Sequence, residues 1–314
     1  MRYRLGIDSG GSKTLGILEA IDNGRSERWE ARVGNTNHHS CPPDIAQHRI
    51  TRLIAMLCRE GDIEPGDLEG ICFAGAGIDS DADTRLVTGW LREMGCDGRL
   101  LVCSDALAAL AGANGTLSGG MVLSGTGSIA LGIDREGGVV RVGGWGYKLD
   151  DAGSGYGTAI LGLRAAYEAL DGRGKPTAIG AAMLEAVGAA DMHALLDWLY
   201  APECTPDRIA RLAGCVSGLS GSDDVADEIL DQAADGLTRL AVTLVSRLGL
   251  EQVSLGLCGG MLQNVKPLSD RVLQRLADEP HIGAHLPRHS AAEGALILLE
   301  QSEENNPCDT PSSI

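Results

Sequence analysis

The order of apolar runs and glycine turns near residue 5 is repeated near residue 121, and this repeat limits most strongly what the chain can fold into. In each case a short apolar strand, a polar turn rich in glycine, a second strand, another turn and a third strand follow one another. The first turn reads "DSGGSKT" and the second reads "SGTGS". Because the order of elements is repeated while the sequence is not, we interpret it as an architectural repeat that gives the chain two related halves.

Neither glycine turn fits the two common phosphate-binding loops that are followed by a helix. The first turn lacks the glycine spacing of a Walker A loop. After Thr14 the chain continues for only about one strand length before a strong turn at 22–24, which disfavours a helix there. The segment 125–130 matches the dinucleotide pattern G-x-G-x-x-[GA], but the turn at 134–138 leaves no room for a helix. Both turns are therefore predicted as hairpin tips, where successive backbone N–H groups can bind an anion. For the first, a plain glycine hairpin is the alternative; together the two tips could clasp a polyphosphate.

Apolar periodicity predicts the other elements of the two halves. Strands are expected at 5–8, 14–20, 25–32, 70–74, 100–103, 121–123, 129–133, 139–142 and 253–257. Helices are expected at 44–59, 80–94, about 105–113 and 290–300, with helical patterns throughout 154–248. The polar end of the chain, which contains two prolines, is expected to be a flexible tail at 302–314.

Charge and cysteine content narrow the partners and the compartment. A net charge of −17 and a pI of about 4.7 argue against binding to nucleic acid or to an anionic membrane, so an anionic nucleotide would need backbone N–H groups or a cation. No targeting segment or run of 18 apolar residues is visible. The nine cysteines are scattered without a C-x-x-C pair, which is typical of reduced thiols and predicts a cytoplasmic protein.

Two polar segments are candidates for chemistry. Asp105 follows a predicted strand and begins a short helix, where a carboxylate can act as a general base or simply cap the helix. The segment 143–155 is a long loop of glycine, aspartate and aromatic residues, and long irregular loops are usually functional. Asp150 and Asp151 could bind sugar hydroxyls or a cation there. His38 and His39 are candidates for contact with a small molecule, with solvated loop histidines as the alternative.

Taken together, these segments resemble the ATPases of the actin, sugar-kinase and Hsp70 superfamily. Within it, the chain is similar to the BadF/BadG/BcrA/BcrD ATPase family and its branch of N-acetylglucosamine kinases. The resemblance extends over about residues 3–300 and is carried by "GIDSGGSKT", "GNTNH", "VCSDALAALAG", "LSGTGSIA", "GGWGYKLDDAGSGYGTA" and "CGGMLQN". "SGTGS" and the "GGWG" block are its most specific parts.

The resemblance implies an α/β fold of two RNase-H-like domains that flank a nucleotide and sugar cleft. The N-terminal domain would span 1–113 and be joined by the C-terminal helix at about 289–301. The C-terminal domain, with helical insertions, would span 114–288. A homodimer is also expected.

Residue roles are carried over position by position. ATP would be held by a set of glycines and polar residues: Gly10, Gly11, Ser12, Lys13, Thr14, Gly125, Thr126, Gly127, Ser128, Gly259, Gly260 and Asn264. Asp8 would hold Mg²⁺. The sugar would contact Asn37, Gly75, Asp105, Ser128, Gly144, Trp145, Gly146 and Asp151. Asp105 would take the proton from the acceptor hydroxyl, expected to be O6.

The resemblance predicts a kinase for N-acetylglucosamine, but departures from the family pattern keep other functions open. The usual "GDEGS" reads "DDAGS" here, and Ile129 stands where the animal enzymes have a sugar-binding Asn. Glucosamine kinase is therefore an alternative. Two alternatives belong to other classes. One is an Fe–S activator ATPase of the same family, against which the scattered cysteines count. The other is a non-catalytic sugar sensor, against which the retained Asp8 and Asp105 count.

Overall fold

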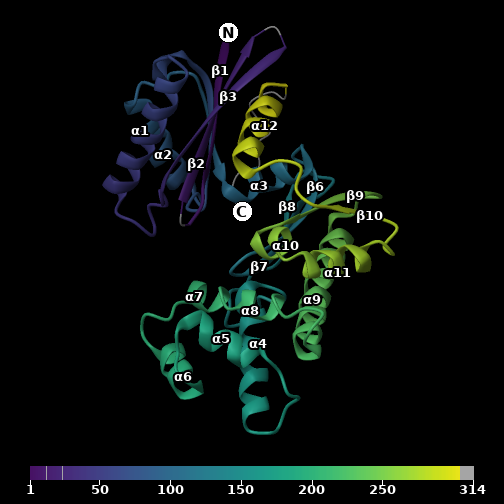
Figure 1. Ribbon diagram of the computed structural model, residues 1–314. Helices are drawn as coiled ribbons and strands as arrows, with labels where there is room; N and C mark the ends of the chain where they lie inside the picture. The colour runs from purple at the N-terminus through teal and green to yellow at the C-terminus, as the bar shows by residue number, and fades with distance from the viewer. Residues whose placement is uncertain (12, 23, 305–314) are drawn as a thin grey trace. The chain divides into compact units, whose positions relative to one another are not determined.

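The computed structural model describes residues 1–11, 13–22 and 24–304. The chain divides into two compact units (Figure 1). Unit 1 comprises Met1–Ser118, Gly137–Val139 and the segment from Pro287 onward. Unit 2 comprises Gly119–Glu136 and Val140–Leu286.

Unit 1 contains a five-stranded sheet. Its strands are β1 (Arg2–Ser9), β2 (Lys13–Asp22), β3 (Arg25–Gly34), β4 (Leu68–Gly75) and β5 (Arg99–Ser104). Their order is β3-β2-β1-β4-β5; β2 is antiparallel to both β1 and β3, whereas β1, β4 and β5 are parallel to one another. Ser9 pairs with Thr14 at the closed end of β1 and β2, which confirms the first predicted hairpin.

Helices cover both faces of this sheet (Figure 1). They are α1 (Pro43–Glu60), the short 3-10 helix η1 (Pro65–Asp67), α2 (Asp81–Glu93), α3 (Asp105–Asn114) and α12 (Ala291–Glu304). The period of two in β4 directs Ile71 and Phe73 into the core shared with α1 and α2, whereas Cys72 and Ala74 pack with α3 and α12. The helix α12 continues to Glu304, three residues into the segment expected as a tail, and the rest of that segment, 305–314, lies outside the described part of the chain.

The sheet of unit 2 repeats the arrangement of unit 1. Its strands are β6 (Gly119–Ser124), β7 (Ser128–Ile133), β8 (Val139–Gly143), β9 (Val253–Cys258) and β10 (Ile282–His285). The order β8-β7-β6-β9-β10 corresponds strand by strand to that of unit 1, with β6 and β7 antiparallel and β9 parallel to β6 and β10. The architectural repeat predicted from the two glycine turns is therefore confirmed.

Helices make up most of the rest of unit 2. They are α4 (Gly155–Leu170), α5 (Ile179–Val187), α6 (Met192–Tyr200), α7 (Pro206–Ala210), α8 (Ala213–Ser217), α9 (Asp224–Leu248), α10 (Gly260–Asn264) and α11 (Lys266–Leu276). The amphipathic α9 packs against β6, β7, α4 and α11, in a core built almost entirely from Ala, Leu, Ile, Val and Met. No single helix among the described residues is long and apolar enough to cross a membrane; α5 and α6 meet that test only as a pair bent by 60°.

Candidate active site

The carboxyl ends of three parallel strands bring the predicted chemistry of unit 1 to one edge of its sheet. Ser9 is in register with Gly75, and Gly75 is in register with Ser104. Asp8 and Asp105, the neighbours of these residues in the chain, therefore lie at the same edge. In open α/β sheets this is the edge where ligands bind.

Asp105 is the first residue of α3, one position after the N-cap. The N-cap residue is Ser104, so the sequence-based alternative that Asp105 is the cap is wrong. Burial raises the pKa of Asp105 above its ordinary value, and the negative charge of Asp79 adds to the effect. A partly buried carboxyl group whose pKa is raised is well suited to accept a proton near neutral pH.

Asp8 lies at the end of β1 with oxygen atoms suited to a hard cation. Burial and, to a smaller extent, the charge of Asp105 raise its pKa to about 6, and the charge of Lys13 opposes this rise. Two carboxylates that repel each other would be stabilised by a divalent cation, and carboxylate oxygens are ligands that Mg²⁺ accepts. The residues present therefore fit the expected magnesium ion.

The first glycine loop is a short, open hairpin tip. The Gly10 N–H donates to the Lys13 carbonyl oxygen (3.1 Å), and a Cβ added to Gly11 would meet no atom within 4 Å. Gly11 and Lys13 are exposed, while Thr14 is fully buried. Ser12, the remaining predicted phosphate contact of this loop, lies outside the described residues.

Asn37 is held at the same edge of unit 1. Its side-chain amide donates to the Ala76 carbonyl oxygen (3.1 Å), directly after the predicted sugar contact Gly75. Its side-chain oxygen accepts from the backbone N–H of His39 (2.9 Å). A Cβ on Gly77 would lie 2.5 Å from that oxygen, so only glycine leaves room for the amide there.

Several hydrogen bonds tie the second glycine loop, in unit 2, to the segment 151–155. The Ser128 backbone N–H donates to Asp151 (2.9 Å), and the Ser128 hydroxyl donates to the Ala152 carbonyl oxygen (3.0 Å). The Ser124 hydroxyl donates to the Gly153 carbonyl oxygen (2.8 Å), and the Gly155 N–H donates to the Gly125 carbonyl oxygen (2.8 Å). The loop is thus fixed to the segment that precedes α4.

Asp151 and the "GGWG" residues differ sharply in exposure. Asp151 is 5% exposed, has a φ of 77°, and directs one oxygen at the loop backbone. Trp145 is 69% exposed, with the Arg141 guanidinium 5.1 Å from its ring centre. Gly144 and Gly146 both have positive φ, so this exposed turn depends on glycine.

The predicted adenosine residues lie beside the second loop. β9 runs parallel to β6, so Cys258 pairs with Leu123 and the next residue, Gly259, reaches the loop. A Cβ on Gly259 would lie 2.3 Å from the Ser124 carbonyl oxygen, and its φ of 90° also requires glycine. Gly260 and Asn264 are the first and last residues of α10, and both are exposed.

Comparison with known proteins identifies the family. The model of the BadF/BadG/BcrA/BcrD ATPase family matches residues 5–298. The chain belongs to this family. This BadF/BadG/BcrA/BcrD ATPase is 31% identical over 306 residues to the N-acetylmuramic acid/N-acetylglucosamine kinase of Clostridium acetobutylicum, with 95% of this chain and 98% of the relative covered. It is also 31% identical over 288 residues to the N-acetyl-D-glucosamine kinase of Dictyostelium discoideum, with 87% and 90% covered.

Solved structures agree with the fold expected for the BadF/BadG/BcrA/BcrD ATPase. A Chromobacterium violaceum protein described as a candidate N-acetylglucosamine kinase has a TM-score of 0.74 and 26% identity, with 95% of this chain and 99% of that chain covered. A glucokinase of Streptomyces griseus shares the fold at a TM-score of 0.58 and 15% identity, with 96% and 100% covered. The predicted α/β fold with two domains of the actin-like ATPase type is confirmed.

Sequence patterns missed two features of the site in unit 1. Thr36 is buried, and its hydroxyl lies 2.6 Å from that of Ser9 and 2.8 Å from that of Thr14. It therefore links the two strand ends that flank the first loop. Asp83 meets both His38 and His39, and the buried His38 does not fit the alternative of solvated loop histidines. The polar run "GNTNHH" was the available signal for Thr36, whereas nothing local pointed to Asp83.

Proposed function

We propose that the chain is an ATP-dependent amino-sugar kinase that phosphorylates N-acetylglucosamine at O6. The observation that carries the proposal is the partly buried Asp105, whose pKa is raised, at the ligand-binding edge of the sheet in unit 1. The choice of substrate rests on the names of the two curated relatives, both of which include N-acetylglucosamine kinase. The family description as an ATPase supports ATP as the phosphoryl donor.

The proposed reaction needs one proton acceptor and strong charge stabilisation. Asp105 accepts the proton of the sugar hydroxyl as its oxygen bonds to the γ-phosphorus of ATP. The bond between that phosphorus and the β,γ-bridging oxygen breaks, and ADP leaves with the electron pair. Positioning and electrostatics supply most of the catalysis of such a transfer.

Nucleotide binding is assigned to glycine-rich backbone in both units. In unit 1, the N–H groups of Gly10 and Gly11 with Ser12, Lys13 and Thr14 would bind phosphate oxygens. In unit 2, the loop 125–128 would do the same, and Gly259, Gly260 and Asn264 would contact the adenosine. At Gly11 and Gly125 an added Cβ would meet no atom within 4 Å, so both loops allow the close approach that such contacts need. Asp8 would hold Mg²⁺, which neutralises phosphate charge when bound.

Sugar binding is assigned to polar groups that the fold holds in place. In unit 1, Asn37 and Gly75 lie near Asp105 along the same sheet edge, and the amide of Asn37 is oriented by Ala76 and His39. In unit 2, Ser128 and the segment 144–146 are assigned to the sugar. We assign Asp151 to the same ligand through its second oxygen, because its first already binds the Ser128 N–H.

A coupled assay of ADP release tests this function. The chain is assayed with MgATP and, in turn, N-acetylglucosamine, glucosamine, N-acetylmannosamine, N-acetylmuramic acid and glucose. We expect ADP release to be stimulated most by N-acetylglucosamine, and preferential turnover of glucosamine would support the closest alternative substrate. If no sugar stimulates ADP release, the chain is not a sugar kinase.

A further inference from the structure

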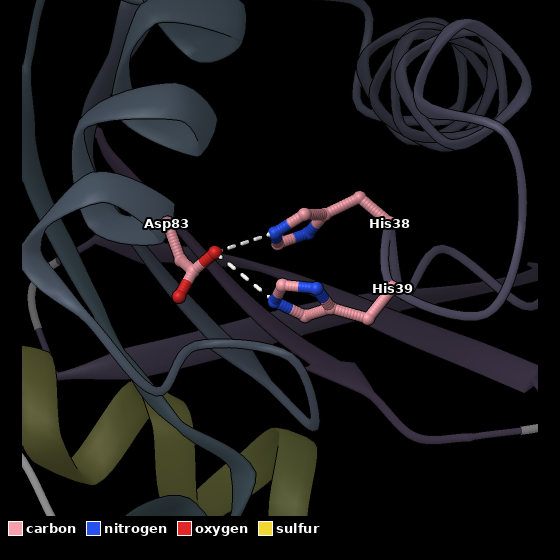
Figure 2. A group of neighbouring side chains, drawn as sticks. All are labelled: His38, His39 and Asp83. Atoms are coloured by element: carbon pink, nitrogen blue, oxygen red, sulfur yellow. Dashed lines mark hydrogen bonds and ion pairs between the residues drawn. The ribbon is translucent and has the colours of Figure 1, made fainter.

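Three side chains to which no catalytic role is assigned meet at one point in unit 1. His38 and His39 lie in the loop between β3 and α1, and Asp83 lies in the first turn of α2. Nε2 of His38 is 2.8 Å from Oδ1 of Asp83, and Nε2 of His39 is 3.1 Å from the same oxygen (Figure 2). All three potential ligand atoms lie within 4.8 Å of one another.

The carboxylate at the centre of this group is oriented by its own neighbours. Oδ2 of Asp83 accepts from the Ser80 hydroxyl (2.5 Å) and the Asp79 backbone N–H (3.3 Å), which directs Oδ1 towards the two histidines. The hydrogen bonds from Ser80 and then from His38 hold the pKa of Asp83 well below its ordinary value. The group therefore contains a charged oxygen ligand with an outer layer of hydrogen bonds of the kind found around metal ligands.

Burial fixes two of the side chains and leaves the third open to solvent. The side chains of His38 and Asp83 are 8% and 11% exposed, and the edge of the Trp90 ring packs against His38. The side chain of His39 is 54% exposed, and its ring lies 4.3 Å from that of His38. An ion could reach the group from the side of His39 without disturbing the core.

We propose that His38, His39 and Asp83 bind one divalent transition-metal ion with the ligand preference of Zn²⁺. Two imidazole nitrogens and one carboxylate oxygen form the ligand set of three-residue zinc sites, in which water takes the fourth position. Mg²⁺ and Ca²⁺ prefer all-oxygen ligands and would bind poorly. Zinc bonds of about 2.0–2.2 Å in a tetrahedron separate ligand atoms by about 3.3–3.6 Å, so the two contacts between the imidazole nitrogens and the carboxylate oxygen need to widen by less than about 1 Å.

The bound ion would connect the loop of residues 35–41 to the start of α2. Asn37 directly precedes the two histidines and accepts from the backbone N–H of His39, so the ion would also restrict that amide. The inference concerns metal binding alone and does not depend on the proposed kinase activity. Both can fail separately, because the test below contains neither ATP nor sugar.

Metal titration of the full chain tests the site. The chain is first treated with a chelator, then titrated with Zn²⁺ by calorimetry and with Co²⁺ as a spectroscopic probe. We expect one ion per chain and the visible absorption of Co²⁺ in a low-coordinate N/O site. His39→Gln should weaken Zn²⁺ binding at least about tenfold, a loss that even outer-layer changes typically cause. The matched control, His193→Gln in the exposed part of α6, should bind as the unmodified chain does.

Asp83→Asn provides a second variant, with its fold checked by thermal unfolding because Asp83 also bonds to Ser80 at the start of α2. Asp83→Asn should lose Zn²⁺ binding as His39→Gln does. Because the His39 side chain is exposed, His39→Gln is not expected to disturb folding. The proposal is overturned if His39→Gln binds Zn²⁺ as tightly as the unmodified chain, which would place the ion elsewhere. It is equally overturned if the unmodified chain binds neither Zn²⁺ nor Co²⁺.

Discussion

The two glycine loops occupy equivalent positions in two equivalent sheets, yet they are built differently. The loop of unit 1 has an exposed tip with a lysine and adjoins Asp8, whose pKa is raised to about 6. The loop of unit 2 is fastened by Asp151, by the hydroxyls of Ser124 and Ser128, and by the backbone of Gly155. We infer that the charged groups which act in the reaction lie at the first loop, whereas the second loop is rigid and has its final shape before a ligand binds.

The largest effect should come from the charged edge of unit 1. Asp105→Asn should lower sugar-dependent turnover by about 10²–10⁴-fold, because the amide cannot accept the proton. Steady-state kinetics measure this, with Asp79→Asn as the matched control for loss of a neighbouring negative charge. If the two variants retain equal turnover, Asp105 is not the base.

A matched pair of glycine substitutions tests the contrast in rigidity. A Cβ on Gly127 would lie 2.9 Å from an Asp151 oxygen, whereas one on Gly11 would meet nothing within 4 Å. Gly127→Ala should therefore cost about 1–3 kcal/mol of stability, and Gly11→Ala should stay within about 0.5 kcal/mol. Urea unfolding of the ligand-free chains measures both. Equal losses would show that the two loops do not differ in rigidity.

The raised pKa of Asp8 predicts a pH-dependent stability. Because the folded chain holds this proton up to about pH 6 and the unfolded chain only to about 3.9, stability falls as the pH rises through this window. Asp8→Asn removes that loss and should stabilise the metal-free chain by up to about 3 kcal/mol at pH 7.5 but not at pH 4. Urea unfolding at the two pH values measures this, with exposed Glu27→Gln as control. A constant difference between the two pH values would contradict the assignment.

The smallest effects separate the inner from the outer contacts of the second loop. Ser124 is fully buried, and Ser124→Ala should cost about 1 kcal/mol through the lost bond to Gly153. Thr126→Val removes an exposed bond to Asp207 and should change stability by less than about 0.5 kcal/mol. Thermal unfolding compares them. A larger loss for Thr126→Val would place the main support of the loop at its surface.

Local patterns were sufficient to predict nine of the ten described strands, the hairpins and their repetition. Apolar runs and glycine turns act within a few residues of each other, so the first hairpin and the helix α1 could be predicted from sequence. The family resemblance, in turn, supplied the kinase-like roles. Ser104 rather than Asp105 occupies the N-cap position of α3, a distinction that depends on backbone dihedral angles and not on the residue types alone.

Tertiary packing produced the features that sequence could not predict. Asp83 meets His38 across 45 positions in the chain, and Thr36 reaches Ser9 across 27. Burial of the Asp151 carboxylate likewise depends on the backbone of the second loop, which has room for the carboxylate only because Gly127 has no side chain. Such contacts depend on how strands and helices are assembled rather than on the residues next to them.

A sugar that lacks the accepting hydroxyl tests the central claim most directly. The chain is incubated with MgATP and either N-acetylglucosamine or its 6-deoxy analogue, and ADP release and the phosphorylated product are measured. We predict rapid ADP release with a 6-phosphate product for N-acetylglucosamine, and ADP release no faster than without sugar for the analogue. Transfer of phosphate to the 6-deoxy sugar, or equal ADP release with both, would contradict phosphorylation at O6.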